Sequence, residues 1–308
     1  MTLNKSRLAI AVLSAGIVGT FAHAAEPAGT LKKVKESGTM TLGVRETSVP
    51  FSYQDDKQQF MGYSLDLCMK VVDEVKKELA LPNLKVELVP TKPATRIPLL
   101  ANGTTDLQCD GASITAERKN QIAFSPTIFF TGNRLLTKKS SNVKTLDDLK
   151  GKPIVSVSGT TNIKQISQLN TERQLGMNVL TASEDNEAFM MVDTGRAVAF
   201  AQDDIHSAAL IANAKNPDAY VISDESLSAD PYGLMFRRDD PQFKSLVDKA
   251  IIGVFQSGEI NKIYAKWFQS PIPPKGTNLN WPMSKYLKAA IAHPTDSHDP
   301  NHYFSLVK

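Results

Sequence analysis

A stretch of nine residues combines a glycine, two hydroxyl groups and an arginine in a pattern suited to binding an anion. It reads DGASITAER over Asp110–Arg118 and follows the apolar, strand-like segment 105–109. Glycine lets a backbone approach a ligand closely, and hydroxyls, backbone N–H groups and a guanidinium are donors that hold a carboxylate. Ser113 and Arg118 therefore form a candidate carboxylate site. The alternative is a turn followed by a surface arginine.

Polar groups also stand where two helices are expected to begin in the second half of the chain. Thr160 and Thr161 follow Gly159, and hydroxyls with free N–H groups at a helix N-terminus suit an anion. The alternative is that they only cap the helix. Asp203 follows an apolar strand, where its carboxylate could hold an ammonium group. It could instead cap the next helix together with Asp204.

Two more arginines, each beside an expected strand or helix, are candidates for a second carboxylate. Arg45 ends the first predicted strand and Arg96 precedes a short apolar helix. Ligands of α/β sheets bind at such strand ends, although either arginine could instead form a surface ion pair. Phe51 and Tyr53 could pack on the aliphatic part of a ligand, or belong to the core.

The elements that must position these residues alternate between strands and helices in both halves of the chain. This alternation predicts an α/β fold with mostly parallel sheets covered by helices. The helix over 64–79 has a candidate N-cap at Ser64 and an apolar stripe at helical spacing. The other expected strands are 40–44, 84–89, 107–109, 154–157, 196–201 and 220–222, and the other expected helices are 95–101, 160–169, 186–194 and 203–214.

Two short apolar strands that run into basic residues, 132–139 and 232–238, are expected to cross between the halves. The helical patterns after the second crossing need a surface to cover, which returns the chain to the first half. The result is two lobes with a ligand cleft between them, a usual place for a small-molecule site. Lobe 1 is expected to hold residues 30–133 plus 237–275, and lobe 2 residues 134–236.

The two ends of the chain are expected to lie outside these lobes. Lys5 and Arg7, the apolar run 8–21 and the small residues Ala22-His23-Ala24 indicate a signal peptide, 1–24, cleaved near Ala24. The alternative is a retained anchor. No cysteine follows the run, so a lipoprotein is not expected. Residues 276–308 are expected to form a polar C-terminal extension with a disordered end.

Composition restricts the function further. The 308 residues are 42% hydrophobic and 22% charged with a net charge of +3, which indicates a globular protein without a nucleic-acid partner. Cys68 and Cys109 could form a disulfide after export or remain two buried thiols, since spacing alone does not bring Cα atoms together. No metal or cofactor is predicted, and we expect the histidines of the tail to be solvated: His293, His298 and His302.

Taken together, these motifs resemble the solute-binding proteins of polar amino-acid ABC transporters (family 3) over roughly residues 30–275. The shared motifs are VPFSY at 49–53, MGYSLD at 61–66, SITAER at 113–118 and SGTT at 158–161. Within the family, the chain looks most similar to glutamate/aspartate-binding proteins. That similarity is carried by RE at 45–46, TRIPLL at 95–100, GRAVAF at 195–200 and PIPPK at 271–275.

The resemblance implies a type II periplasmic-binding-protein fold that closes over a free amino acid. It also implies a monomer in the periplasm and an inner-membrane permease complex as partner. Arg118 with Ser113 would bind the ligand's α-carboxylate, Thr160 and Thr161 would assist, and Asp203 would bind the ammonium group. The remaining ligand residues would be Arg45, Arg96 and Phe51.

Two positions depart from the glutamate/aspartate-binding pattern. Pro93 replaces a serine three residues before Arg96, and Asp185 stands near the place of a histidine that reaches the ligand side chain. A carboxylate would repel a ligand carboxylate, so glutamine, asparagine or another polar amino acid is an alternative ligand. An enzyme resembling cyclohexadienyl dehydratase and a sensory domain for a membrane receptor are alternatives of a different class.

Overall fold

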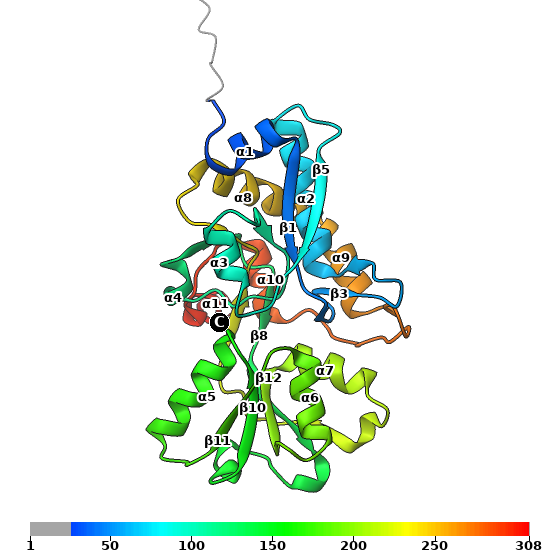
Figure 1. Ribbon diagram of the computed structural model, residues 1–308, viewed down its shortest axis with the longest axis vertical. Helices are drawn as coiled ribbons and strands as arrows, with labels where there is room; N and C mark the ends of the chain where they lie inside the picture. The colour runs from blue at the N-terminus through cyan, green and yellow to red at the C-terminus, as the bar shows by residue number, and fades with distance from the viewer. Residues whose placement is uncertain (1–25, 308) are drawn as a thin grey trace, which may run out of the picture.

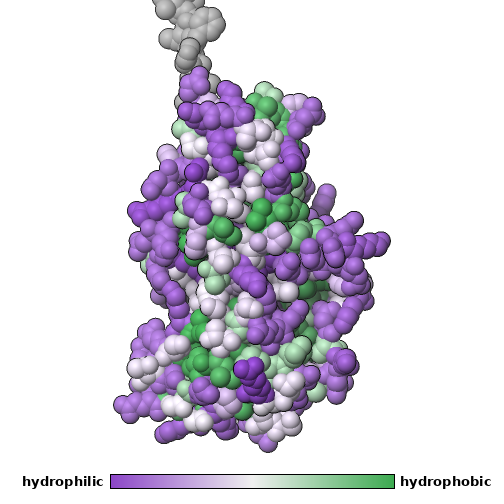
Figure 2. Space-filling model, in the orientation of Figure 1, coloured by the Kyte–Doolittle hydropathy of each residue, from purple (hydrophilic) through white to green (hydrophobic). Residues whose placement is uncertain are grey.

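The computed structural model describes residues 26–307, which form two α/β lobes stacked along the long axis of the molecule (Figure 1). The expected signal peptide, 1–24, lies outside the described residues. None of the helices in the described part of the chain is long and apolar enough to cross a membrane. Hydrophilic residues cover most of the face shown in Figure 2, and hydrophobic residues form small groups on it.

Lobe 1 is built on a five-stranded sheet in the order β5-β1-β6-β15-β7. Its strands are β1 (Thr39–Val44), β5 (Lys85–Pro90), β6 (Leu107–Gln108), β7 (Ile122–Phe124) and β15 (Met235–Arg237). A small sheet of β2 (Thr47–Ser48), β3 (Ser52–Gln54) and β4 (Phe60–Met61) flanks it. The helices are α1 (Gly29–Ser37), α2 (Tyr63–Glu78), α3 (Arg96–Ala101), α4 (Ala116–Lys119), α8 (Pro241–Gln256) and α9 (Glu259–Phe268).

Lobe 2 repeats this plan with the strand order β11-β10-β12-β9-β13. Its strands are β9 (Asn133–Lys138), β10 (Pro153–Val157), β11 (Asn178–Ala182), β12 (Ala199–Asp203) and β13 (Tyr220–Ile222). Its α-helices are α5 (Thr161–Glu172), α6 (Asp185–Asp193) and α7 (Asp204–Asn213). In each lobe four of the five strands run in the same direction, as the prediction of mostly parallel sheets requires. One strand, β15 in lobe 1 and β9 in lobe 2, runs antiparallel to both of its neighbours.

Helix α2 shows how the sequence pattern becomes packing. The predicted apolar stripe is fully buried against the sheet, and it consists of Leu67, Val71, Val72 and Val75. Each such side chain contributes about 1.5–3 kcal/mol of burial. Ser64, however, is not the N-cap, because the helix begins one residue earlier after Gly62. Gly62 has φ of 138°, and a Cβ there would lie 2.2 Å from the carbonyl oxygen of Phe51, so only glycine fits this entry.

The chain crosses between lobes through two short antiparallel strands, β8 (Phe129–Thr131) and β14 (Asp230–Tyr232). The crossings therefore lie a few residues before the segments expected from sequence, 132–139 and 232–238. Most of those segments form β9 and β15, which belong to the sheets of lobes 2 and 1. The boundary of lobe 2 expected at residue 236 is accordingly too late, because Met235 already pairs with β6 and β7.

The C-terminal extension is folded, so the expectation of a disordered end was wrong. Helices α10 (Lys285–Ala292) and α11 (Pro300–Ser305) pack on lobe 1 beside β8 and α8. The side chain of Tyr303 is fully buried, and its hydroxyl lies 2.7 Å from Oγ1 of Thr127. The prediction rested on the polar composition of residues 276–308, although a few apolar side chains in this segment face lobe 1. The three tail histidines are exposed, as expected.

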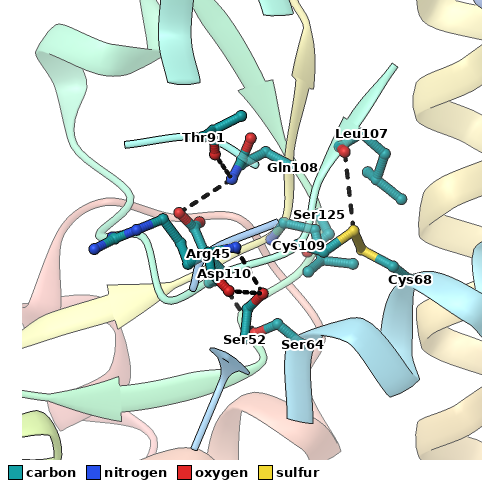
Figure 3. The surroundings of a disulfide bond; sticks show 11 residues. Arg45, Ser52, Ser64, Cys68, Thr91, Leu107, Gln108, Cys109, Asp110 and Ser125 are labelled. Atoms are coloured by element: carbon teal, nitrogen blue, oxygen red, sulfur yellow. Dashed lines mark hydrogen bonds between the residues drawn. A yellow bond between two sulfur atoms is a disulfide. The ribbon is translucent and has the colours of Figure 1, made fainter. Parts of the chain in front are cut away.

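Cys68 of α2 and Cys109 at the end of β6 form a disulfide, with their Cα atoms 6.0 Å apart. Figure 3 shows that this bond lies beside Asp110, the first residue of the candidate anion-binding stretch. Oγ of Ser64 donates to the carbonyl oxygen of Asp110 at 3.1 Å. The disulfide therefore joins α2 to the end of the strand that carries the candidate site.

Candidate functional site

Most of the predicted site residues meet in a small cavity between the two lobes. Both lobes contribute strand ends and helix starts to it. The cavity is strongly charged, and its lining consists of Arg45, Ser48, Arg96, Gly111, Ser113, Arg118, Thr160, Thr161, Asn162, Asp185, Gln202, Asp203, His206 and Tyr232.

Arg118 is a buried cation rather than a surface arginine, with only 6% of its surface exposed. Thr115 caps α4 by accepting from the backbone N–H of Arg118, which fixes the start of this short helix. The guanidinium donates to the carbonyl oxygens of Ser113 (2.9 Å) and Gly159 (3.3 Å). Among the described residues, no carboxylate forms an ion pair with it. Burial, with repulsion from Arg96, lowers the pKa of Arg118 to about 10.

Hydroxyl groups from both lobes surround this cation. Oγ of Ser113 lies 3.2 Å from Oγ1 of Thr161, across the cleft. Thr160 is the N-cap of α5: its Oγ1 accepts from the backbone N–H of Ile163. Capping and cavity lining are therefore compatible at this position. The start of α5, with its positive dipole end, faces the same space as Arg118.

Asp203 is a buried acceptor on another part of the wall. It precedes α7, yet its side chain does not cap the helix. Its carboxylate instead accepts from Nδ2 of Asn162 (2.8 Å) and from the hydroxyl of Tyr232. Burial, with the nearby charge of Asp230, raises the pKa of Asp203 to about 6. A ligand ammonium group would supply the positive charge that this carboxylate lacks.

Arg96 and Arg45 are also buried, at 3% and 4% exposure, but both already have carboxylate partners. Nη1 of Arg96 lies 2.5 Å from Oδ2 of Asp110, within lobe 1. Nη2 of Arg45 lies 2.5 Å from Oε2 of Glu184, across the cleft. Burial lowers the pKa of Arg45, but Asp185, Glu184 and Asp110 outweigh that effect, so it is raised overall. Neither arginine is a surface residue.

The two aromatic candidates lie outside this cavity. Phe51 is fully buried behind the wall, with its ring 5.1 Å from the ring of His206 and 5.4 Å from that of Tyr232. It packs on residues that line the cavity and does not line the cavity itself, so the structure favours the core alternative. Tyr53 borders a neighbouring cavity, and its hydroxyl donates to the carbonyl oxygen of Pro273.

Sequence reasoning missed several lining residues. His206 is the clearest case, because it stands three residues after Asp203 and therefore shares a helix face with it. Burial lowers the pKa of His206, which favours the neutral imidazole. Gln202 donates to Oδ1 of Asp185 at 2.6 Å, which places Asp185 in the cavity. The other missed lining residues, Ser48, Asn162 and Tyr232, carry no sequence signal of their own.

The lobes approach one another closely where the SGTT motif meets Pro93. Gly159 has φ of 78°, and a Cβ at this position would lie 2.5 Å from Cα of Ala94. Glycine is therefore required by both the backbone conformation and the lack of space. No group of histidine, cysteine and acidic residues that could hold a metal ion occurs within residues 26–307. The lining of the cavity carries buried cations and buried carboxylates side by side.

Comparison with known proteins defines the family. Residues 40–270 match the family described as bacterial extracellular solute-binding proteins, family 3. The chain belongs to this family. This solute-binding protein is 49% identical to the L-glutamate/L-aspartate-binding protein of Pseudomonas aeruginosa, over 94% of its own length and 98% of that protein. It is 43% identical to the glutamate/aspartate import solute-binding protein of Escherichia coli, over 96% and 99% of the two chains.

Solved structures of similar proteins share the fold. An ancestral arginine-binding protein bound to arginine gives a TM-score of 0.68 at 29% identity, covering 75% of this solute-binding protein and 98% of that chain. An ancestral amino acid-binding protein described as a precursor of cyclohexadienyl dehydratase gives 0.65 at 29% identity, covering 78% and 99%. The expected type II two-lobe architecture is thus confirmed.

Proposed function

We propose that the protein binds a free acidic amino acid, glutamate or aspartate, and delivers it to an ABC permease in the inner membrane. The observation that carries this proposal is the buried guanidinium of Arg118, which has no carboxylate partner among the described residues and faces a cavity closed by both lobes. The printed names of the two curated relatives support the choice of ligand.

The cavity suits each charged group of such a ligand. The α-carboxylate would lie on Arg118, with Ser113, Thr161 and the start of α5 as further donors. The ammonium group would be held by Asp203. A side-chain carboxylate would be directed toward Arg45 and Arg96, which stand on the same wall. A desolvated contact between such charged groups contributes about 1.5–3 kcal/mol.

Glutamine or asparagine is a second candidate ligand, and one structural observation favours it. Arg45 and Arg96 are already paired with Glu184 and Asp110, and Asp185 adds another carboxylate to this end of the cavity. An amide offers both an acceptor for arginine and a donor for a carboxylate. A second ligand carboxylate would have to compete for the same arginines.

We infer binding without turnover. The cavity has one buried carboxylate with a raised pKa, Asp203, and it is held by Asn162 and Tyr232 in an orientation suited to an ammonium group. The ancestral neighbour related to cyclohexadienyl dehydratase is itself described as an amino acid-binding protein. Incubation with a cyclohexadienyl acid should give no product, and measurable dehydration would reverse this inference.

Titration calorimetry with glutamate, aspartate, glutamine and asparagine tests the proposed function. We expect saturable binding of at least one acidic amino acid. The Arg118→Ala variant should lose it. A protein that binds none of the four ligands, nor other polar amino acids, would refute the proposal.

The proposal includes a mature monomer in the periplasm, released by cleavage near Ala24. Cell fractionation followed by N-terminal sequencing should recover a periplasmic chain that begins close to Ala25. Light scattering of that chain should give the mass of one copy. A full-length, membrane-bound product would contradict both the cleavage and the location.

A further inference from the structure

Glu184 is a lobe 2 residue whose side chain reaches into lobe 1. It occupies the N-cap position of α6, but its side chain does not cap that helix. Its Oε2 accepts from Nη2 of Arg45 at 2.5 Å and from Oγ1 of Thr47 at 2.7 Å. The carboxylate is 16% exposed, so it is largely withdrawn from solvent.

The two ion pairs at this end of the cavity differ in one important respect. Arg96 and Asp110 both belong to lobe 1, so their pairing does not depend on the position of the lobes. Arg45 and Glu184 belong to different lobes, so their pairing exists only when the lobes are closed. Arg45 would therefore be free to attract a ligand in an open protein and would become committed to Glu184 on closure.

This arrangement decides which side chain the closed cavity accepts. A ligand carboxylate near Arg45 would share one guanidinium with Glu184 and would lie close to a like charge in a partly buried site. An amide would meet no such repulsion, and its N–H₂ group could donate to a nearby carboxylate. Specificity is a difference between two affinities, and a built-in repulsion can set it.

We propose that Glu184 is a specificity-determining residue that occupies Arg45 in the closed protein and lowers the preference for a second ligand carboxylate relative to an amide. This inference rests on the proposed function, because it concerns the side chain of the amino acid bound on Arg118. Under this proposal Arg45 has two partners, one after the other: the ligand during loading and Glu184 after closure.

The test compares the affinities for glutamate and glutamine in the wild type and in Glu184→Gln. The variant keeps the size and one acceptor of the side chain but removes its charge. We expect the affinity ratio to shift at least about tenfold toward glutamate, because one like charge has left the neighbourhood of the ligand carboxylate. The ratio for aspartate and asparagine should shift in the same direction.

Glu117→Gln is the matched control. Glu117 also pairs across the cleft, with Lys164, but that pair is exposed and lies outside the cavity. Its loss should change both affinities alike and leave the ratio unchanged. This control variant distinguishes a general weakening of lobe closure from a change in ligand specificity.

A second variant, Thr47→Val, removes the other anchor of Glu184 and leaves its charge in place. We expect a smaller shift of the ratio in the same direction, and this variant serves if Glu184→Gln does not fold. An unchanged ratio in both variants, or a shift toward glutamine, would overturn the role of Glu184. Failure of the wild type to bind any of the four amino acids would instead overturn the proposed function.

Discussion

At the scale of single residues, the cavity is defined by which charges are paired inside the protein. Arg118 is buried beside Ser113 and Gly159 without a carboxylate, whereas Arg45 and Arg96 each have one. The sequence identified all three arginines, because polar residues at strand and helix ends are readily noticed. It could not identify Glu184 as the partner of Arg45, since the two residues are 139 positions apart.

Replacement of Arg118 by alanine should remove the shared α-carboxylate contact and weaken every amino-acid ligand alike. We expect a loss of about two orders of magnitude in affinity or more, as for the truncation of a buried charged anchor. Calorimetry with glutamate and glutamine measures it. Arg173→Ala is the control, because Arg173 forms only an exposed ion pair with Asp147. Full affinity in Arg118→Ala would show that the carboxylate binds elsewhere.

The pKa of about 6 at Asp203 makes binding dependent on pH. An ammonium group needs the ionised carboxylate, so affinity should be constant above pH 7 and fall about tenfold between pH 7 and pH 5. The free energy of unfolding changes in the opposite sense. Folding raises this pKa, so protonation between pH 7 and pH 4 neutralises the buried charge and makes the folded protein more stable. Titrations at pH 5, 6 and 7 measure the first effect. The Asp203→Asn variant should bind weakly and show no such pH dependence.

At the scale of elements, most regular segments were predicted close to their true limits, and a few short strands were missed. Helix α2 and strands β1 and β10 were expected close to their true limits, because many residues contribute to each periodic pattern. Strand β8 has only three residues, too few to show alternation, so the crossing was placed a few residues late. Strands β7 and β15 are equally short: β7 was not predicted, and β15 was taken for part of a crossing.

The packing of helix α11 depends on one buried side chain more than on a periodic apolar pattern. The hydroxyl of Tyr303 donates to the carbonyl oxygen of Ser297 and lies 2.7 Å from Oγ1 of Thr127, next to the hinge strand β8. We expect Tyr303→Phe to lower the free energy of unfolding by about 1–2 kcal/mol. Urea denaturation measures it. Tyr286→Phe should have no effect, because no hydrogen bond of that hydroxyl occurs in the described residues.

The disulfide ties α2 to β6 across a loop of 41 residues. Cross-linking a loop of this length restricts the unfolded chain and stabilises the fold by roughly 4 kcal/mol. The double variant Cys68→Ala, Cys109→Ala should therefore unfold at a clearly lower denaturant concentration. Because Cys109 precedes Asp110, the variant should also bind its ligand less tightly. Equal stability of the oxidised and cysteine-free proteins would show that packing alone holds these elements.

At the scale of the whole molecule, the two-lobe plan was predictable because each lobe repeats the same alternation of strands and helices. The contacts between the lobes were not, since they join residues that no local pattern connects. Hinge closure around a ligand is the usual motion of such proteins. Ser113 contacts Thr161 and Arg45 contacts Glu184 across the cleft, so we expect the site to be complete only when the lobes are this close.

The clearance between the lobes is tested by Gly159→Ala. The added methyl group would lie 2.5 Å from the backbone of Ala94, so the lobes could not reach the observed separation. We expect ligand affinity to fall at least tenfold, roughly 1.4 kcal/mol, and small-angle scattering with saturating ligand to show an extended molecule. Gly151→Ala is a suitable control, since Gly151 also has a positive φ but no neighbour within 4 Å. A Gly159→Ala protein that is compact and binds its ligand tightly would show that glycine is not required at this position.

The narrow clearance at Gly159 has a consequence for the cell. If the protein delivers its ligand as proposed, a variant whose lobes cannot close would hold the amino acid weakly and would not present the closed shape to a permease. A single added methyl group at this position would therefore abolish delivery without altering any residue that contacts the ligand.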